Sequence, residues 1–464
     1  MSAFPAFLTA GTFFHAVSII QRKTMLFKNY YGILLRKINR NGMLEEAETV
    51  RFVWIMKERN HGMKVCGIIA EYNPFHKGHA YQLKKIREDL RADYIVIAMS
   101  GDFVQRGEPA LLEKHLRAEM ALRCGADLAL ELPVRVSTSS AEGFADGAIR
   151  LLASLGVVTH VCFGAETDSP LLHRVADLLA GESPEFRRIL SSFLSEGFSM
   201  PAAREEAATA CLQDPEVRKI LRQPNNILAV EYLKSIRRNG LTCEPWILIR
   251  EGEGYHSDDL NDQTFASASA IRKALQTGSL EQALAFLPDP VKEILSKASV
   301  QDTFLFDKDL DSLLFYRLFC EDEDSLIQYA DVDADLARRI LRYRNEYQSF
   351  SSFADKLGSR SLTRSHTRRA LLHILFQVKK NSPEGLYGRV LGFRRESAPL
   401  LSAIKKNASI VLITKQADAV SLLSSEQQHV FLETTIASNL CETIRSAKSG
   451  APFRHEYSRP VVIL

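Results

Sequence analysis

The sequence predicts an α/β fold with a parallel sheet, followed by a mostly helical part and a small mixed C-terminal segment. From Met63 onward, short apolar runs rich in β-branched residues alternate with segments of helical spacing, which is the pattern of βαβ units. From Leu280 to Lys380 the strand-like runs disappear while helical spacing continues. Ligands of parallel sheets bind where the strands end, so residues at those ends are the first candidates for a site.

The alternating elements can be placed one after another. The strands are expected at Val65–Glu71, Tyr94–Met99, Leu128–Leu132, Val157–Phe163 and Pro245–Arg250. The helices are expected at Phe75–Leu90, Pro109–Cys124, Ala141–Leu155, Pro224–Gly240 and Ser267–Gln276. Pro109 suits a first helical position and Gly125 suits a helix end. Further strand-like runs lie at Ile410–Ile413 and Val461–Leu464.

At 464 residues the chain is too long for one ordinary core, so several domains are expected. Residues 1–62 differ in pattern from the rest of the chain, and we interpret them as an extension that is disordered or not native. An arm that touches RNA is the alternative. The sheet domain is expected at 63–280, with a helical insertion at about 169–223. A helical domain is expected at 281–385 and a mixed α/β segment at 386–464.

Composition narrows the class of protein. Hydrophobic residues make up 46% and charged residues 25%, as in ordinary globular proteins, and the net charge of +3 is too small to indicate nucleic acid by itself. The seven cysteines are scattered without a CxxC pair, which argues against a zinc site or a disulfide framework and predicts a cytoplasmic location. The apolar residues 3–20 contain Pro5, Gly11 and His15 and have no basic segment before them. We therefore expect neither a signal peptide nor a membrane span.

The most informative motif follows the first strand. The strand ends at an Asn73–Pro74 turn, and His76 and His79 follow with Gly78 between them. If a helix starts here, both imidazoles share a face at its N-terminus, where free N–H groups and the helix dipole favour an anion. Gly78 would let a phosphate approach the backbone. The alternative is a surface or zinc-binding pair, although the Glu of a zinc protease helix is missing.

In this setting the HxGH motif resembles the nucleotidyltransferase superfamily, which binds ATP in this way. The resemblance implies a Rossmann-like nucleotidyltransferase domain at 63–280. Candidate ATP contacts around the motif are Ile69, Ala70, Glu71, Tyr72, Asn73, Pro74, Phe75, Gly78 and Gln82. Those at other strand ends and helix starts are Gly101, Gly164, Asn225, Asn226 and Arg250.

A second motif opens the last helix of the sheet domain. Ser267 or Ser269 can cap this helix, and serine hydroxyls with free N–H groups can bind phosphate oxygens. Arg272 can add a bidentate charge. A capped helix without a ligand is the alternative reading. Before this motif, Gln105 and Arg106 follow the second strand and suit a small carboxylate, although a loop held by a surface ion pair explains them equally well.

The third region is electrostatic. No acidic residue lies between Asp355 and Glu384 in the sequence. Arg360, Arg364 and Arg368 are spaced by four residues and share one helical face if the helix extends that far. With Arg369, they form a candidate surface for an RNA backbone. A solvated helical face is the alternative.

Several longer motifs resemble the tRNA(Met) cytidine acetate ligase family. They include "GIIAEYNPFHKGHAYQL", "MSGDFVQRGEPA", "QPNNILAVEYLK", "SASAIRKAL" and the C-terminal "SLTRSHTRRALLHILF". The resemblance covers residues 63–464, whereas the segment 1–62 departs from the family pattern. It implies that ATP activates acetate as acetyl-AMP and that the acetyl group passes to the wobble cytidine of elongator tRNA-Met.

The resemblance also assigns roles. His76, His79 and Lys77 would stabilise phosphate charge in the transition state. Ser267, Ser269 and Arg272 would hold the pyrophosphate, and Mg²⁺ would bridge phosphate oxygens without an identified ligand set. The helical domain would bind tRNA, and no obligate protein partner is evident. Two alternatives remain: an adenylyltransferase for a small phosphate ester, and an RNA-binding protein with a vestigial ATP site.

Overall fold

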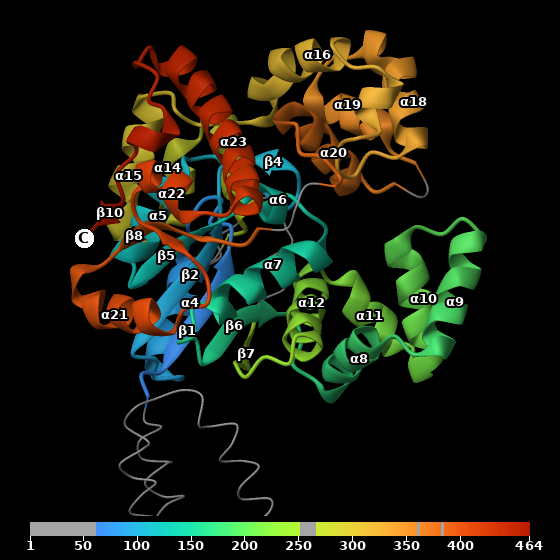
Figure 1. Cartoon of the computed structure of the whole chain (residues 1–464), viewed down its shortest axis with the longest axis horizontal. Coiled ribbons are helices and arrows are strands. Elements are labelled where there is room, and N and C mark those ends of the chain that lie inside the picture. The colour runs from blue at the N-terminus through green and yellow to red at the C-terminus, as the bar shows by residue number, and fades with distance from the viewer. Residues whose placement is uncertain (1–61, 251–265, 360–361, 382–384) are drawn as a thin grey trace, which may run out of the picture. The chain divides into compact units, whose positions relative to one another are not determined.

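A mainly parallel β-sheet lies at the centre of the described part of the chain, which a computed structural model gives for residues 62–250, 266–359, 362–381 and 385–464. The strand order is β10-β8-β5-β2-β1-β6-β7, with β9 beside β8 (Figure 1). The strands are β1 Val65–Ala70, β2 Tyr94–Ser100, β5 Leu128–Leu132, β6 His160–Ala165, β7 Glu244–Ile249, β8 Gly388–Phe393, β9 Leu412–Ile413 and β10 Val462–Ile463. A short hairpin pairs β3 Phe103–Val104 with β4 Glu108–Pro109.

Helices cover both faces of the sheet, which explains why its central strands are mostly apolar. On one face, Ile68 of β1 and Ile97 of β2 share a core with helices α4 (Lys77–Glu88), α5 (Lys114–Arg123) and α15 (Asp289–Val300). On the other face, Leu152 of α7 (Ala141–Ser154) lies against Gly67 of β1. A Cβ at Gly67 would stand 2.8 Å from that leucine side chain, so the glycine lets α7 pack closely on β1.

The register of the parallel strands brings their carboxyl ends to one edge. Ala70 of β1 pairs with Met99 of β2, and Ile68 of β1 pairs with Cys162 of β6. β7 extends the same parallel set on the far side of β6. The segments that follow β1, β2, β6 and β7 therefore start at the same edge, where a ligand is expected.

The predicted α/β class is confirmed, with shifts of a few residues at element ends. The helix expected from Phe75 begins at Lys77, and the strand expected at Val157–Phe163 is β6, His160–Ala165. The strand β8 was not predicted. It pairs antiparallel with β5, and β10 pairs parallel with β8, so the C-terminal segment widens the sheet of the N-terminal part.

The remaining helices follow the expected distribution. The segment predicted to be an insertion holds α8 Pro170–Gly181, α9 Pro184–Ser195, α10 Met200–Leu212 and α11 Glu216–Arg222. Helices α6 Val134–Ser137, α12 Pro224–Arg238, α13 Ala268–Gln276 and α14 Leu280–Ala285 belong to the sheet region. The helical part holds α16 Asp311–Phe319, α17 Glu323–Leu326, α18 Ala334–Tyr343, α19 Phe350–Leu357 and α20 Arg364–Phe376. The C-terminal helices are α21 Ala398–Asn407, α22 Ala419–Leu422 and α23 Ser425–Ser449.

Helices α16–α20 have their own apolar core, which also takes in Phe103 from β3 and Cys441 from α23. Residues Lys64–Leu464 together form one compact unit. The division of this unit into three domains stays a prediction. None of the helices in the described ranges combines the length and the apolar character that a membrane crossing requires.

A buried ionic cluster joins the sheet to the C-terminal segment. Lys114 of α5 is 1% exposed, and its Nζ lies 2.6 Å from Glu131 of β5 and 2.8 Å from Glu456. The same nitrogen donates to Ser438 Oγ of α23 at 2.7 Å. Arg389 of β8 contacts both carboxylates, at 2.6 and 2.5 Å. The cluster compensates buried charges that come from segments far apart in the sequence.

We predict that Lys114→Met destabilises the protein by about 3 kcal/mol or more, because it removes one of the two cations that compensate the buried carboxylates of Glu131 and Glu456. Urea unfolding would measure this change in the free energy of unfolding. The matched control is Lys84→Met on α4, where the lysine is 67% exposed and pairs with Glu88 at 3.8 Å. That exposed pair should contribute less than about 1 kcal/mol. Equal effects of the two substitutions would contradict this account of the cluster.

Candidate active site

The junction between β1 and α4 fixes the positions of both histidines. His76 is the N-cap of α4, and its Nδ1 accepts the backbone N–H of Gly78 at 3.1 Å. The Nδ1 of His79 accepts the backbone N–H of His76 at 3.3 Å. The two rings stack with centroids 3.8 Å apart and planes inclined by 23°. Two imidazoles thus form the reciprocal cap that a serine and a glutamate form in many other helices.

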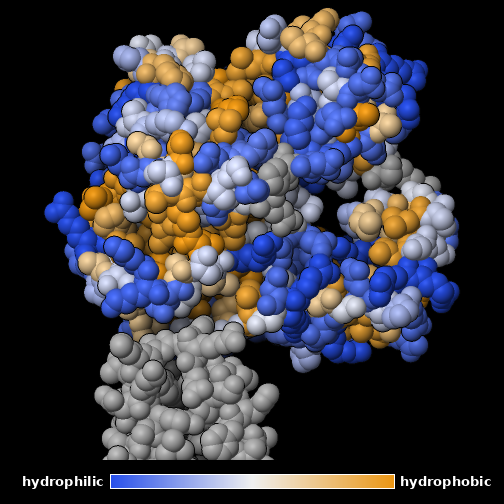
Figure 2. Space-filling view, viewed as in Figure 1, coloured by the Kyte–Doolittle hydropathy of each residue, from blue (hydrophilic) through white to orange (hydrophobic). Residues whose placement is uncertain are grey.

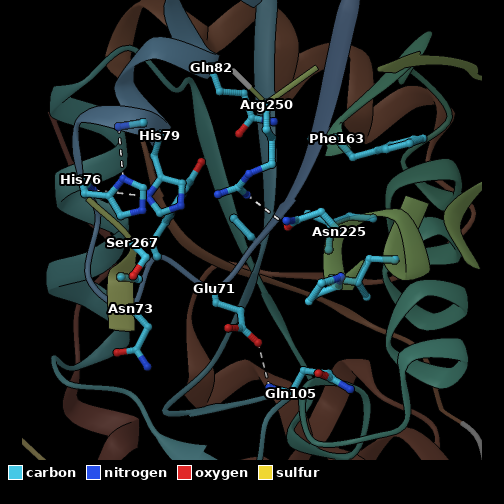
Figure 3. A pocket seen from close by; sticks show the side chains of 18 of the residues that line it. Glu71, Asn73, His76, His79, Gln82, Gln105, Phe163, Asn225, Arg250 and Ser267 are labelled. Carbon is cyan, nitrogen blue, oxygen red and sulfur yellow. Dashed lines mark hydrogen bonds between the residues drawn. The ribbon is translucent and has the colours of Figure 1, made fainter. Parts of the chain in front are cut away.

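These hydrogen bonds determine which ring nitrogen carries the proton. Nδ1 of each ring accepts a bond, so a neutral imidazole must carry its proton on Nε2. Each histidine therefore keeps one N–H donor that the cap does not use. Figure 3 shows the two rings side by side at the cavity, with dashed lines marking the bonds of the cap. Two such donors beside a helix N-terminus are suited to phosphate oxygens.

The histidines are held neutral by their surroundings. Burial, with a smaller contribution from Arg250, lowers the pKa of His76 to about 3. Burial, the neighbouring His76 and Arg250 hold the pKa of His79 well below its ordinary value of 6.5. Both rings are therefore uncharged donors near neutral pH, and the formal positive charge of the site comes from arginine.

Both imidazoles line a cavity of about 440 Å³ at the carboxyl edge of the sheet. Most of the predicted ATP contacts line the same cavity: Ile69, Ala70, Glu71, Tyr72, Asn73, Gly78, Gln82, Gly164, Asn225, Arg250, Ser267, Ser269 and Arg272. Gln105 and Arg106, predicted to suit a carboxylate, line it as well. The fold thus brings residues from several strand ends and helix starts to one place.

Helix α13 brings the second motif to the cavity. Ser267 is its N-cap, and its Oγ accepts the backbone N–H of Ala270 at 3.1 Å. Arg272 donates through Nη1 to the carbonyl oxygen of Asn73 at 2.7 Å and through Nη2 to Glu108 at 2.6 Å. The guanidinium therefore ties α13 to the loop after β1. This contact brings the serine motif close to the histidine motif, and Figure 3 shows Ser267 beside His76, although the two motifs lie far apart in the sequence.

A third group of residues lies on the side of the cavity formed by β6, β7 and α12. Arg250, directly after β7, donates to Asn225 Oδ1 at 3.1 Å, and Asn225 Nδ2 donates to Glu166 at 2.6 Å. Asn226 points away from the cavity: its Oδ1 accepts the backbone N–H groups of Glu166 and Thr167, at 2.9 and 3.1 Å. Asn225 thus orients Arg250, while Asn226 fixes the loop after β6.

Five candidate residues do not line the cavity: Pro74, Phe75, Lys77, Gly101 and Asn226. Phe75 is fully buried, with its ring centroid 4.8 Å from that of Tyr72. Gly101 lies over the buried cluster, and a Cβ there would come within 2.6 Å of Glu131 Oε1. These two positions shape the site from behind. The backbone N–H of Lys77 donates to the carbonyl oxygen of Phe286 at 2.9 Å and is not available to a phosphate.

The sequence is similar to those of known nucleotidyl transferases and acetate ligases. A family model for HIGH nucleotidyl transferases matches residues 63–451. A tRNA(Met) cytidine acetate ligase of Clostridium perfringens is 37% identical over 372 residues, which cover 77% of this chain and 91% of the relative. A tRNA(Met) cytidine acetate ligase of a Thermoanaerobacter species is also 37% identical, over 369 residues that cover 78% of this chain and 91% of the relative.

The fold is also similar to that of a solved structure. The crystal structure of Thermotoga maritima TmcAL bound with alpha-thio ATP is 30% identical, has a TM-score of 0.80 and covers 87% of this chain and 100% of that one. The chain belongs to the tRNA(Met) cytidine acetate ligase family. This relationship confirms the resemblance expected from the motifs.

Several cavity residues of this family member were not predicted. They are Glu108, Phe144, Phe163, Leu228 and Tyr232. Phe163 and Tyr232 contact each other with ring centroids 5.1 Å apart and form an apolar wall. Tyr232 and Leu228 lie on α12, which covers the sheet, so the rule that strand ends form the site does not find them. Glu108 becomes identifiable only through its contact with Arg272.

The structure changes the interpretation of the predicted basic helix. Helix α20 begins at Arg364, and Arg360 lies outside the described residues. The premise that these arginines lack acidic neighbours is wrong, because tertiary structure supplies them. Arg368 pairs with Asp307 at 2.7 Å and is 7% exposed, and Arg369 pairs with Asp331 at 3.4 Å and is also 7% exposed. Arg364 pairs with Asp355 at 2.8 Å but remains 62% exposed.

The low pKa of His76 predicts a pH dependence of stability. Unfolded His76 gains a proton near pH 6.5, whereas the folded pKa is about 3. Between these values the unfolded state binds more protons, so the free energy of unfolding falls as the pH is lowered. His76→Asn keeps an N-cap acceptor for Gly78 but removes this titration. At about pH 4.5 the free energy of unfolding of the variant should therefore have fallen by roughly 2 kcal/mol less than that of the wild type.

Thermal unfolding of both proteins at several pH values between about 4.5 and 7.5 would test this prediction. The control is His429→Asn, a histidine that is 46% exposed on α23. It lies outside the cavity and should not reproduce the effect of His76→Asn. Parallel profiles for the wild type and His76→Asn would show that His76 titrates normally in the folded protein.

Proposed function

We propose that this protein is an ATP-dependent tRNA(Met) cytidine acetate ligase. It activates acetate as acetyl-AMP with release of pyrophosphate, and it then transfers the acetyl group to N4 of the wobble cytidine of elongator tRNA-Met. The observation that carries this proposal is the capped pair of neutral histidines, which lies with Ser267 and Arg272 in one cavity of a chain of this family. The relatives named above supply the substrate class, and the solved structure with an ATP analogue supports ATP as the ligand of this cavity.

In the first half-reaction, a carboxylate oxygen of acetate attacks the α-phosphorus of ATP and pyrophosphate leaves. Negative charge builds on the phosphate oxygens as this happens. The Nε2–H groups of His76 and His79 are fixed by their Nδ1 bonds, so they can stabilise that charge without reorganising. Ser267, Ser269 and Arg272 hold the pyrophosphate side, and Lys77 adds positive charge near the start of α4. Arg250 and Gly164 border the nucleoside side.

Mg²⁺, when bound with ATP, would supply positive charge to the phosphates during the first half-reaction. In the described ranges, no three His, Cys, Asp or Glu side chains gather into a group that could hold a metal ion. The described residues of this cavity therefore do not offer a protein cage, which agrees with the preference of Mg²⁺ for phosphates and water. We assign no ligand and no step to the ion.

We predict that His79→Ala lowers acetate-dependent ATP–pyrophosphate exchange at least ~100-fold, the scale of losing one transition-state donor. The control is His173→Ala on α8, which does not line the cavity. Exchange at the wild-type rate in His79→Ala would remove the histidine from the proposed mechanism. A wild-type enzyme that exchanges only with a small phosphate ester would favour the adenylyltransferase alternative, and acetylated cytidine in tRNA can be followed by nucleoside mass spectrometry.

The tRNA is proposed to contact the helical part. Hydrophilic residues predominate on the face of α16–α20 seen in Figure 2. Of the predicted arginines whose positions are described, Arg364 is the exposed one, so we assign the phosphate contact to it. Arg368 and Arg369 are proposed to act indirectly, by holding α20 against the segments of Asp307 and Asp331.

We predict that Arg364→Ala weakens tRNA binding and lowers the slope of log K against log salt by roughly one unit, with little change in stability. Arg368→Ala should instead lower the unfolding temperature, because it leaves Asp307 without its partner. Filter binding over a salt series and thermal unfolding distinguish the two effects. An unchanged slope in Arg364→Ala would place the tRNA elsewhere.

A further inference from the structure

One carboxylate in the cavity has no place in phosphate binding. Glu71 directly follows β1 and lines the cavity, and its side chain points into it in Figure 3. Its Oε1 accepts the backbone N–H of Gln105 at 2.9 Å, while no described residue donates a hydrogen bond to Oε2. Its carbonyl oxygen accepts from Arg117 Nη1 at 2.5 Å, so the backbone is held as well. A fixed carboxylate would repel a triphosphate, which favours a role for Glu71 in a step other than phosphate binding.

The groups around Glu71 shift its pKa in opposite directions. Burial raises its pKa, and the Gln105 N–H, Arg106 and Arg272 oppose this shift while Glu108 adds to it. Arg117 and Tyr232 also interact electrostatically with Glu71. Arg106 is exposed, lines the cavity and has no ion-pair partner within the described ranges. A carboxylate in such surroundings can accept a proton nearer neutral pH than an exposed glutamate does.

A buried amide nitrogen, that of Asn73, lies two positions further along the same loop and has no hydrogen-bond partner among the described residues. Asn73 is 2% exposed and lines the cavity. Its Oδ1 accepts the backbone N–H of Leu111 at 2.8 Å, which identifies the other atom as Nδ2. That Nδ2 is buried and has no hydrogen-bond partner among the described residues. Figure 3 shows Glu71, Asn73 and Gln105 at one end of the cavity and Gln82 at the other. One end of the cavity thus offers an unused acceptor and an unused donor.

We propose that Glu71 is the general base of the acetyl transfer and that Asn73 donates to the acetyl carbonyl oxygen. This inference rests on the proposed function. The cytidine N4 attacks the carbonyl carbon of acetyl-AMP, and a C–N bond forms. The C–O bond of the mixed anhydride breaks, and its electron pair leaves on the phosphate oxygen of AMP. The nitrogen loses one proton, which goes to Glu71 Oε2. The Asn73 Nδ2–H stabilises the negative charge that develops on the carbonyl oxygen.

The same contact selects the base. Before the transfer, the Glu71 carboxylate accepts a hydrogen bond from the exocyclic N4–H₂ of cytosine, the pairing by which carboxylates read cytosine in nucleic acids. Uracil presents a carbonyl oxygen at this position, so two acceptors would face each other with no proton between them. Glu71 therefore combines recognition of the cytidine with removal of its proton.

The test separates the two half-reactions in the full-length enzyme. Acetyl-AMP is first formed on the enzyme from radiolabelled acetate and ATP, and tRNA-Met transcript is then added in a single turnover. Glu71→Gln should lower transfer at least ~100-fold and acetate-dependent exchange by less than ~10-fold, because glutamine keeps the bond to Gln105 but cannot take the proton. The wild-type transfer rate should rise with pH as Glu71 ionises and then level off, and Glu71→Gln should lack this rise.

Two further variants complete the experiment. Glu71→Asp keeps a base on a shorter side chain, so it should transfer slowly but retain the rise with pH. Glu88→Gln removes a carboxylate that is 55% exposed at the end of α4 and should transfer at the wild-type rate. Unchanged transfer by Glu71→Gln, or equal losses in both half-reactions, would overturn the assignment of Glu71 alone. A wild-type enzyme without acetate-dependent exchange would overturn the proposed function, and this inference with it.

Discussion

The reciprocal cap of helix α4 is the constraint on which the site depends. Each imidazole uses Nδ1 to satisfy a backbone N–H that the helix itself cannot satisfy, and this choice leaves Nε2–H as a donor that the cap does not use. The structural bond therefore determines the chemical state of the ring. Burial keeps both rings neutral, which lets two of them stack at 3.8 Å without repulsion. A charged pair at the same place would repel, and a surface pair would change its charge with pH.

The positive charge in the cavity comes from arginines that tertiary contacts hold in place. Arg272 spans Asn73 and Glu108, and Arg250 is oriented by Asn225. Glu108 Oε2 also lies 3.9 Å from Arg368, which pairs with Asp307. A chain of alternating charges thus runs from the cavity into the helical part. This arrangement explains why an arginine that looks like an RNA contact in the sequence serves as internal support in the structure.

Below the site, the buried cluster around Lys114 connects the sheet with the C-terminal segment. Glu131 of β5 meets Lys114 from α5 and Arg389 from β8, and it also limits position 101 to glycine. The C-terminal segment therefore takes part in holding β5 within the sheet. A buried carboxylate that lacked either cation would be costly, which makes the three segments interdependent.

The sequence by itself determined the α/β class, the histidine and serine motifs and most of the cavity-lining residues after β1. These features depend on local rules: the period of apolar residues, helix caps and the convergence of parallel strand ends. Tertiary structure alone decided the pairing of β8 with β5, the burial of Arg368 and Arg369, and the aromatic wall of Phe163 and Tyr232. The acidic partners of the two buried arginines lie on segments well before α20 in the sequence. Local spacing shows which face a side chain occupies, but only the folded chain shows which distant charge meets it there.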